Sequence, residues 1–203
     1  MMDTKVVSDN CYSKIAITEL LSLLKQSHLL STSGAAIYSF EKKYVSNDDM
    51  NDLLNCEAER ILVFVRKELR GFLSALFAGR GVIFEDYSSS ILRAFVAVKK
   101  FMHHPPRHIT ACKNDSPSDE HQRYFLLTNK EKRIMELFSS GISVHQISFI
   151  MDNHHKIVST HKRNCMKKMG ISSDVELMQR GRMLMLVMKK RESDLMRGRR
   201  PVQ

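Results

Sequence analysis

The sequence of 203 residues lacks any long apolar segment, because its longest unbroken apolar run is six residues, at 183–188. A membrane-spanning helix needs roughly 20 consecutive apolar residues, which excludes a spanning helix here. The first residues contain an acid and only two valines, so they lack the basic and apolar regions of a secretory signal. We therefore expect a soluble, cytoplasmic protein that does not span a membrane.

Cysteine is scarce, and the four cysteines are scattered without C-x-x-C spacing: Cys11, Cys56, Cys112 and Cys165. This pattern argues against both a zinc ribbon and a disulfide scaffold. The histidine pairs at 103–104 and 154–155 lack the i, i+4 spacing of metal ligands on a helix. No glycine-rich phosphate loop and no Ser/His/Asp or Cys/His catalytic arrangement is present. We expect no metal site, no cofactor and no enzymatic activity.

The net charge of +10 is unevenly distributed along the chain. Residues 1–120 contain 15 basic and 15 acidic residues, whereas residues 121–203 contain 17 basic and 7 acidic residues. A basic end of this kind predicts a polyanionic partner, either nucleic acid or an anionic membrane surface.

Three of the four prolines lie between residues 103 and 123, where periodic apolar residues are almost absent. This composition is typical of a linker, because proline neither continues a helix nor donates to a sheet. The sequence therefore predicts two domains and a basic tail, with these boundaries: 1–102, linker 103–123, 124–190 and tail 191–203.

The first domain alternates strand-like and helical patterns. Short apolar runs predict strands at 5–7, 35–40, 61–65 and 82–84. Apolar residues at helical spacing predict helices at 16–24, 48–58, 69–78 and 91–102, the last capped by one of the serines at 88–90. This alternation predicts an α/β domain with a parallel sheet covered on both faces.

The second domain has only helical periodicity. Thr128 and Glu131 form a capping-box sequence before a helix ended by Gly141, and Ser173 with Glu176 forms another. Ser143 is the expected cap of a second helix, which places Ile147, Ile150 and Met151 inward. A third helix is expected at about 155–169, and a methionine-rich fourth helix follows it.

The third helix has two different faces. The inward stripe is expected to contain Val158, His161, Cys165 and Met169. The outward stripe carries almost no carboxylate and contains Lys156, Ser159, Thr160, Arg163 and Lys167. A helix with such a face, preceded by a helix and a tight turn, suits a DNA major groove. Arg163 can reach a guanine edge, while Lys156 and Lys167 suit phosphates. The alternative interpretation is an ordinary solvated charged face.

The second domain resembles the DNA-binding domain of LuxR/FixJ/NarL-type transcription factors. The residues that carry this resemblance are Leu127-Thr128-x-x-Glu131, Gly141-Ile142-Ser143-x-x-x-Ile147-Ser148-x-x-Met151, Lys156-x-Val158-x-x-His161-x-x-Asn164 and Lys168-Met169-Gly170. The resemblance implies a four-helix domain whose third helix reads DNA and whose fourth contributes to dimerisation. It places DNA contacts at Lys156, Ser159, Thr160 and Arg163.

Three positions depart from that family pattern at the start of the third helix. His154 replaces the usual capping serine, Ile157 replaces a threonine, and Asn153 replaces an apolar residue. These departures predict a less rigid helix start, or a cap supplied by Asn153 or Asp152.

The first domain resembles the receiver domain of response regulators. Asp9 and Asn10 lie where that family has its acidic metal-binding pair, and Glu85 replaces the phosphate-sensing lysine. The pair Val65-Arg66 occupies the usual Ser/Thr position, and no strand ends in an aspartate that could accept a phosphoryl group. The resemblance implies a shortened receiver, with one βα unit shortened or missing, that is not phosphorylated. The combination with the second domain resembles atypical accessory regulators of capsule and fimbrial systems in enteric bacteria.

The function expected from these patterns is sequence-specific regulation of transcription by a homodimer or a heterodimer with a related regulator. The partner would be double-stranded DNA, with no membrane partner. Met178, Met185 and Met188, with Leu184, either form a dimer face or cover the domain's own core. The competing hypothesis is an anti-regulator, which would bind a related regulator and modulate its DNA binding.

Overall fold

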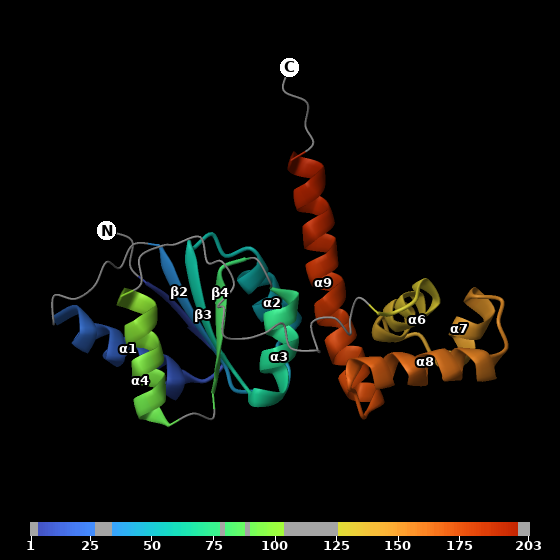
Figure 1. The fold of residues 1–203 in the computed structure, drawn as a ribbon, viewed down its shortest axis with the longest axis horizontal. Coiled ribbons are helices and arrows are strands. Elements are labelled where there is room, and N and C mark those ends of the chain that lie inside the picture. Colours follow the sequence, from blue (N-terminus) through green and yellow to red (C-terminus); the bar gives the residue numbers. More distant parts are fainter. Residues whose placement is uncertain (1–3, 27–33, 78–79, 88–89, 104–125, 199–203) are drawn as a thin grey trace, which may run out of the picture. The chain divides into compact units, whose positions relative to one another are not determined.

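The computed structural model describes residues 4–26, 34–77, 80–87, 90–103 and 126–198 (Figure 1). The chain divides into two compact units. The first contains Met1–Val45 and Asn55–Ser116, and the second contains Ser46–Leu54 and Pro117–Gln203. Each unit is described separately below. Apart from His103, the expected linker lies outside the described residues, as do Ser88 and Ser89.

The first unit is built on a parallel sheet, as the alternating pattern predicted. Its strands are β1 (Lys5–Ser8), β2 (Ala35–Phe40), β3 (Arg60–Val65) and β4 (Val82–Asp86), in the order β1-β2-β3-β4. Every residue of β2 and β3 is buried. Burial on both faces explains why these strands appear as continuous apolar runs rather than as an alternating pattern.

Helices cover both faces of this sheet (Figure 1). Helices α1 (Cys11–Gln26) and α4 (Ile91–His103) share one core with the sheet, in which Leu21 and Val98 are buried. Helix α3 (Lys67–Leu76) lies on the opposite face, where the ring of Phe77 packs 5.7 Å from that of Phe84. The fold class predicted for this domain is therefore confirmed.

Several element boundaries differ from the prediction, among them those of α2 and β4. Helix α2 is Asn47–Leu54 and ends four residues before the expected residue 58, because the chain must turn to begin β3 at Arg60. Its contacts group it with the second unit, where it packs against the last helix. Strand β4 continues to Asp86, since Glu85 and Asp86 pair with the end of β3.

The second unit contains the four helices that the sequence predicted. They are α6 (Asn129–Ser139), α7 (Val144–Ile150), α8 (His155–Met169) and α9 (Asp174–Gly198). Helix α6 packs against α8 and α9, and α7 packs against α8. Their shared core includes Ile134, Ile147, Val158, Cys165 and Leu177. Helix α9 continues into the segment that the sequence indicated as a tail.

Helices α6 and α9 approach closely at Gly181. A Cβ atom at this position would lie 1.9 Å from Ser139 Oγ and 3.3 Å from Met135 Cγ. Beside this contact, Arg182 Nε donates a hydrogen bond of 2.8 Å to the carbonyl oxygen of Ser139. The absence of a side chain at Gly181 therefore allows the two helices to pack at this distance.

In the part of the chain that the structure describes, no helix is long and apolar enough to cross a bilayer.

Candidate nucleic-acid interface

The segment from α7 to α8 forms a helix-turn-helix. Gln146 N donates to Ser143 Oγ at 3.3 Å, and the Gln146 side chain accepts from Ser143 N at 3.0 Å, which completes a capping box. Between the helices, Asp152 adopts a positive φ of 48°, a left-handed conformation that aspartate tolerates better than most residues. The turn is therefore tight, as the sequence indicated.

Helix α8 begins with a cap from His154. Its Nδ1 atom accepts a hydrogen bond of 3.3 Å from the main-chain N–H of Lys156. The expectation that Asn153 or Asp152 would supply the cap is wrong. Asn153 instead donates from its side chain to the carbonyl oxygen of Met151, and Asp152 provides the turn.

The inward face of α8 is close to the prediction. Val158, Cys165 and Met169 are buried, while His161 is only half-buried. On α7 the prediction is wrong for Ile150, whose exposed fraction is 54%, and Met151 is half-buried. Helix α7 has only seven residues, and Ile147 and Ser148 are the ones it buries.

The outward face of α8 contains all five residues that the sequence assigned to DNA contact. Lys156, Thr160, Arg163 and Lys167 are exposed, and Ser159 is half-buried. Thr160 Oγ1 donates a hydrogen bond of 2.9 Å to the carbonyl oxygen of Lys156, one turn earlier. The helix therefore presents a continuous basic and small-polar surface, which we call the outer face of α8.

The five cations of α8 divide into two groups with different surroundings. Lys162 Nζ lies 2.7 Å from Asp174 and 4.7 Å from the ring centre of Phe138, and Lys168 pairs with Glu131. The remaining three, Lys156, Arg163 and Lys167, have no ion pair within the described ranges of the chain. The first group fastens α8 to its own domain, and the second leaves its charge available to an external anion.

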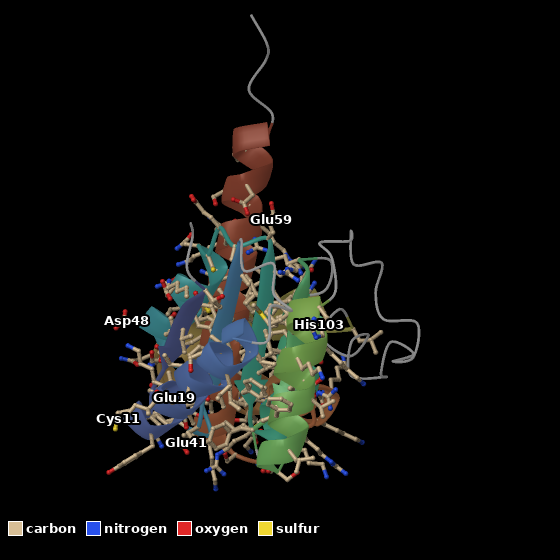
Figure 2. The ribbon with its side chains drawn as sticks, turned by 90° about the vertical axis from the view of Figure 1, so that its left-hand side faces the viewer. Cys11, Glu19, Glu41, Asp48, Glu59 and His103 are labelled. Atoms are coloured by element: carbon tan, nitrogen blue, oxygen red, sulfur yellow. The ribbon has the colours of Figure 1, made fainter. Side chains whose placement is uncertain are left out.

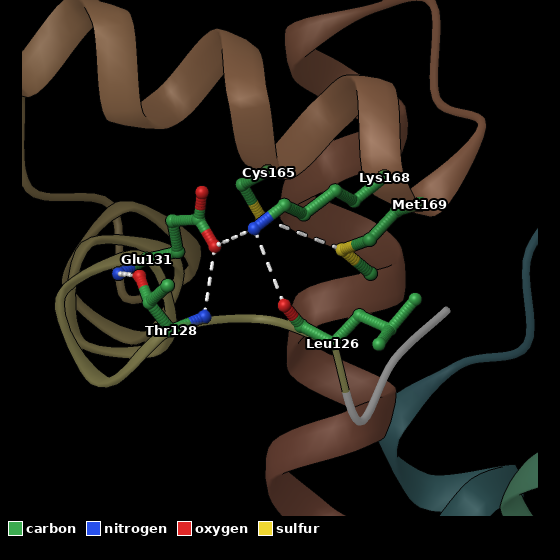
Figure 3. A network of polar contacts seen from close by, with 6 residues as sticks. All are labelled: Leu126, Thr128, Glu131, Cys165, Lys168 and Met169. Carbon is green, nitrogen blue, oxygen red and sulfur yellow. Dashed lines mark hydrogen bonds and ion pairs between the residues drawn. The ribbon is translucent and has the colours of Figure 1, made fainter. Parts of the chain in front are cut away.

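A polar network joins the C-terminal end of α8 to the start of α6 (Figure 3). Lys168 Nζ lies 2.7 Å from Glu131 Oε2 and donates at 3.2 Å to the carbonyl oxygen of Leu126. The same Glu131 oxygen accepts from Thr128 N at 2.8 Å, and Thr128 Oγ1 accepts from Glu131 N at 3.3 Å. The capping box of α6 is thus also the anchor of α8.

This network shifts the pKa of Glu131. Burial raises the pKa of its carboxyl group, but the hydrogen bonds and charge of Lys168 and the N–H of Thr128 outweigh burial, so the pKa falls below its ordinary value. Glu131 is therefore a buried, ionised group at neutral pH. Each of its partners is needed, because an unpaired buried charge is costly.

Cys165 lies next to this network as a core residue. Burial, together with the negative charge of Glu131, raises the pKa of its thiol to about 12. Its Sγ atom donates toward Met169 Sδ at 3.5 Å. The thiol is therefore neutral at physiological pH and acts as a small apolar group.

The start of α9 is capped slightly differently from the prediction. Ser173 Oγ accepts from Glu176 N at 3.2 Å, as expected, but the Glu176 carboxylate accepts from Ser172 N at 3.3 Å. Glu176 also pairs with Arg180 one turn later, at 2.5 Å. Farther along α9, Met178, Met185 and Leu184 are half-buried, and Met188 has an exposed fraction of 40%.

In the first unit, a second polar cluster lies where the strands end. Asp9, Glu41, Arg66 and Tyr87 each follow one of the four strands directly. Glu41 is the centre of this carboxyl-edge cluster, at the end of the sheet away from Glu59 (Figure 2). Its carboxylate accepts from the Tyr87 hydroxyl and the Asn10 amide, its N–H donates to Asp9 Oδ1 at 3.0 Å, and its carbonyl accepts from Arg66 Nε.

The sequence identified Asp9 and Asn10 in this cluster but missed Glu41 and Tyr87. Glu85, the third residue expected there, lies elsewhere, because β4 continues past it. It lines a cleft of about 610 Å³ with Lys67, Arg70 and Arg93. The cluster can be identified from the sequence once the strand ends are known, because its members are the residues immediately after each strand. No group of acidic, histidine or cysteine side chains that could hold a metal ion occurs among the described residues.

The geometry of α7 and α8 defines the second unit as a helix-turn-helix domain. Residues 126–180 match the family model of bacterial regulatory proteins of the luxR family, so this segment is a luxR-family domain. Because the matched segment is about a quarter of the chain, the match concerns this domain alone.

Curated relatives match the same region. The transcriptional regulatory protein UhpA of Escherichia coli (strain K12) is 37% identical over 54 residues, which cover 27% of this chain and 28% of UhpA. The uncharacterized response regulatory protein YgeK of the same organism is 36% identical over 53 residues, covering 26% of this chain and 36% of YgeK. The alignments thus span about a third or less of either relative.

Solved structures match nearly the whole chain. RcsB from Salmonella enterica serovar Typhimurium, bound to the promoter P1flhDC in the presence of phosphomimetic BeF3-, aligns with a TM-score of 0.54 and 15% identity, covering 90% of this chain and 98% of RcsB. RcsB bound to the promoter rprA aligns with a TM-score of 0.51 and 15% identity, covering 89% and 98%. At this identity the match establishes a shared fold only.

Proposed function

We propose that this protein is a sequence-specific DNA-binding regulator of transcription that reads the major groove with α8. The observation that carries the proposal is the outer face of α8, where Lys156, Arg163 and Lys167 are charged and directed away from their own domain. Lysines at the two ends of the helix suit phosphates on either side of the groove, and Arg163 suits a guanine edge. The luxR-family match of residues 126–180 supports the same conclusion.

The working unit in this proposal is a dimer. A dimer places two copies of α8 in successive major grooves, about one DNA turn apart, and so predicts a site of two half-sites. Exposed apolar side chains suited to pairing occur on α1, where Tyr12, Ile15 and Leu23 have exposed fractions of 78%, 59% and 58%. On α9, Met188 is a second candidate, since methionine adapts to irregular contacts.

DNA binding in this proposal does not require phosphorylation. The side chain of Glu41 occupies the end of β2, where its carboxylate is already bonded to Tyr87 and Asn10. The residue at this strand end is a glutamate, not an aspartate that could accept a phosphoryl group. The proposal predicts equal DNA affinity with and without acetyl phosphate. The Glu41→Asp variant is the matched control, because it restores an aspartate with the same charge.

The experiment that tests the proposal is selection of DNA by the purified full-length chain at near-physiological salt. Enriched fragments that share a short repeated motif support a sequence-specific regulator. Uniform enrichment that disappears with added salt contradicts it, because phosphate contacts alone give salt-sensitive binding without sequence preference.

A second candidate function is regulation through a protein partner. Exposed apolar residues on α4, Leu92 at 72% and Val96 at 42%, lie on the same side of the sheet as the exposed residues of α1. Such a surface suits a related regulator with which this chain forms a heterodimer. Co-purification separates the two functions. The partner role is supported if a heterodimer binds the motif and this chain alone does not.

A further inference from the structure

The hydroxyl group of Thr160 is already engaged within its own helix. It has one hydrogen to donate, and it donates this hydrogen to the carbonyl oxygen of Lys156 at 2.9 Å. Back-bonding of this kind, to a carbonyl four residues earlier, is a common arrangement for threonine inside a helix. The other branch of the side chain is the methyl group, which has no polar role. Thr160 therefore offers a DNA groove an apolar methyl group and a hydroxyl oxygen that can accept a hydrogen bond but has no hydrogen left to donate.

Thr160 lies on the outer face of α8. It is exposed, and it neighbours Lys156, four residues earlier, and Arg163, three residues later, on the helix surface. The neighbouring Ser159 is half-buried and has no methyl group. Among the five outward residues, Thr160 is thus the one that combines an exposed position with a short apolar group.

We propose that Thr160 reads thymine by contact between its methyl group and the C5-methyl group of the base. In the major groove, thymine is the base that presents a methyl group, and the threonine methyl is a common partner for it. The inference rests on the proposed function, because it assumes that α8 enters the groove. It adds a base preference that the charges of the outer face do not supply.

The spacing of Thr160 and Arg163 restricts where this thymine lies. Three residues along a helix advance about 4.5 Å, and one base pair advances about 3.4 Å. The thymine therefore lies within about two base pairs of the guanine that Arg163 contacts. Each half-site should contain both bases.

Two substitutions separate the methyl group from the hydroxyl group. Thr160→Ser keeps the hydroxyl and its bond to Lys156 but removes the methyl. Thr160→Val keeps the methyl and removes the hydroxyl, with the same branching at Cβ and hence a closely matched helix. Ile157, with an exposed fraction of 48%, is the other apolar residue near this surface, and Ile157→Ala serves as the control for it.

The experiment uses the full-length chain and the motif obtained by selection. Each thymine of the motif is replaced in turn by deoxyuridine, which lacks only the C5-methyl group, and the dissociation constant is measured. For the unmodified chain, replacing one particular thymine of each half-site should lower the affinity about fourfold, which is the effect of one methyl group in an apolar contact. Thr160→Ser should bind both DNAs equally, whereas Thr160→Val should retain the fourfold difference.

The opposite pattern overturns the inference. If Thr160→Ser keeps the difference and Thr160→Val loses it, the hydroxyl reads the base. If only Ile157→Ala removes the difference, Ile157 is the contact. If no thymine responds to deoxyuridine, Thr160 does not read a methyl group, although the selected motif still upholds the proposed function. Failure to select any motif instead contradicts the proposed function itself.

Discussion

Lys168 reaches from the C-terminal turn of α8 to Glu131 in the first turn of α6, with 2.7 Å between Nζ and Oε2. The neighbouring residue Lys167 points away from the domain and is exposed. Two adjacent lysines therefore differ, because one holds the helix to its domain and the other is exposed. Replacing each lysine in turn with alanine makes the same chemical change at both positions and therefore tests this difference.

Lys168→Ala should destabilise the helical domain, whereas Lys167→Ala should not. Removal of Lys168 leaves the buried carboxylate of Glu131 without its charged partner. Because Lys168 is partly exposed, we expect a loss of about 1.5–3 kcal/mol, the range for a hydrogen bond to a charged group. Removal of Lys167 should change stability by less than about 0.5 kcal/mol, as for most surface positions. Urea unfolding followed by circular dichroism measures both.

DNA binding should respond to Lys167 directly. Lys167→Ala should weaken binding by a similar factor for all sequences and reduce the slope of log affinity against log salt by about 1. A stable Lys168→Ala variant, or a Lys167→Ala variant with unchanged salt dependence, would show that the two roles are assigned incorrectly.

The stability of the helical domain should decrease at acidic pH through Glu131. Its pKa in the folded protein lies below the ordinary value of 4.5. A depressed pKa means that the folded state favours the ionised form, so the contribution is complete above pH 4.5 and disappears as the pH falls through the folded value. Unfolding free energies measured between pH 7 and pH 3 should show this decrease. Glu131→Gln, which cannot ionise, should reduce the pH dependence, and an unchanged profile in that variant would exclude Glu131 as its source.

Cys165 should resist alkylation until the helical domain opens. Its thiol is buried and has a pKa of about 12, so the reactive thiolate is almost absent at pH 8. Cys11 is exposed and provides an internal reference in the same molecule. Iodoacetamide labelling followed by peptide mass spectrometry should modify Cys11 first and Cys165 only in denaturant. Equal labelling rates under native conditions would contradict the described burial.

Gly181→Ala should destabilise the contact between α6 and α9. The new Cβ atom would overlap Ser139 Oγ, and overpacking of this kind costs about 1–3 kcal/mol. The gain in helix propensity, up to about 1 kcal/mol, offsets this only in part. Adding Ser139→Ala removes the closest atom and should restore much of the stability. Hydrogen exchange in α6 and α9 measures the effect locally. If Ser139→Ala does not restore stability, the strain does not come from the contact between Gly181→Ala and Ser139.

Arg163→Ala should reduce sequence discrimination rather than general affinity for DNA. We expect specific binding to weaken by ~1–3 kcal/mol, with relaxed preference at one base of each half-site. Binding is compared between the selected motif and its single-base variants. If discrimination at every position is unchanged in Arg163→Ala, Arg163 contacts only phosphate.

The bounds and faces of α8 could be predicted almost completely because they depend on residues that are close together in the sequence. The stripes of the helix follow from 3.6-residue periodicity over about four turns, and Gly170 marks its end by adopting a left-handed conformation. Ile150 was assigned to the wrong side because α7 has only seven residues, too few for periodicity to fix which side faces the core.

The carboxyl-edge cluster was only partly predictable because it depends on contacts between distant residues. Glu41 meets Asn10 from 31 positions away and Tyr87 from 46 positions away. Local patterns give the strands but not their last residues. An error of two residues at the end of β4 was enough to direct attention to Glu85 instead of Tyr87.

The separation of the two groups of cations on α8 has a consequence for evolution. Lys162 and Lys168 hold the helix in place, while the residues of its outer face have no ion pair with the rest of the described chain. In the proposed function, mutations at positions 156, 159, 160, 163 and 167 therefore change the preferred DNA site at little cost to folding. A duplicated gene could diverge at these few codons and acquire new targets while its product keeps the parental stability.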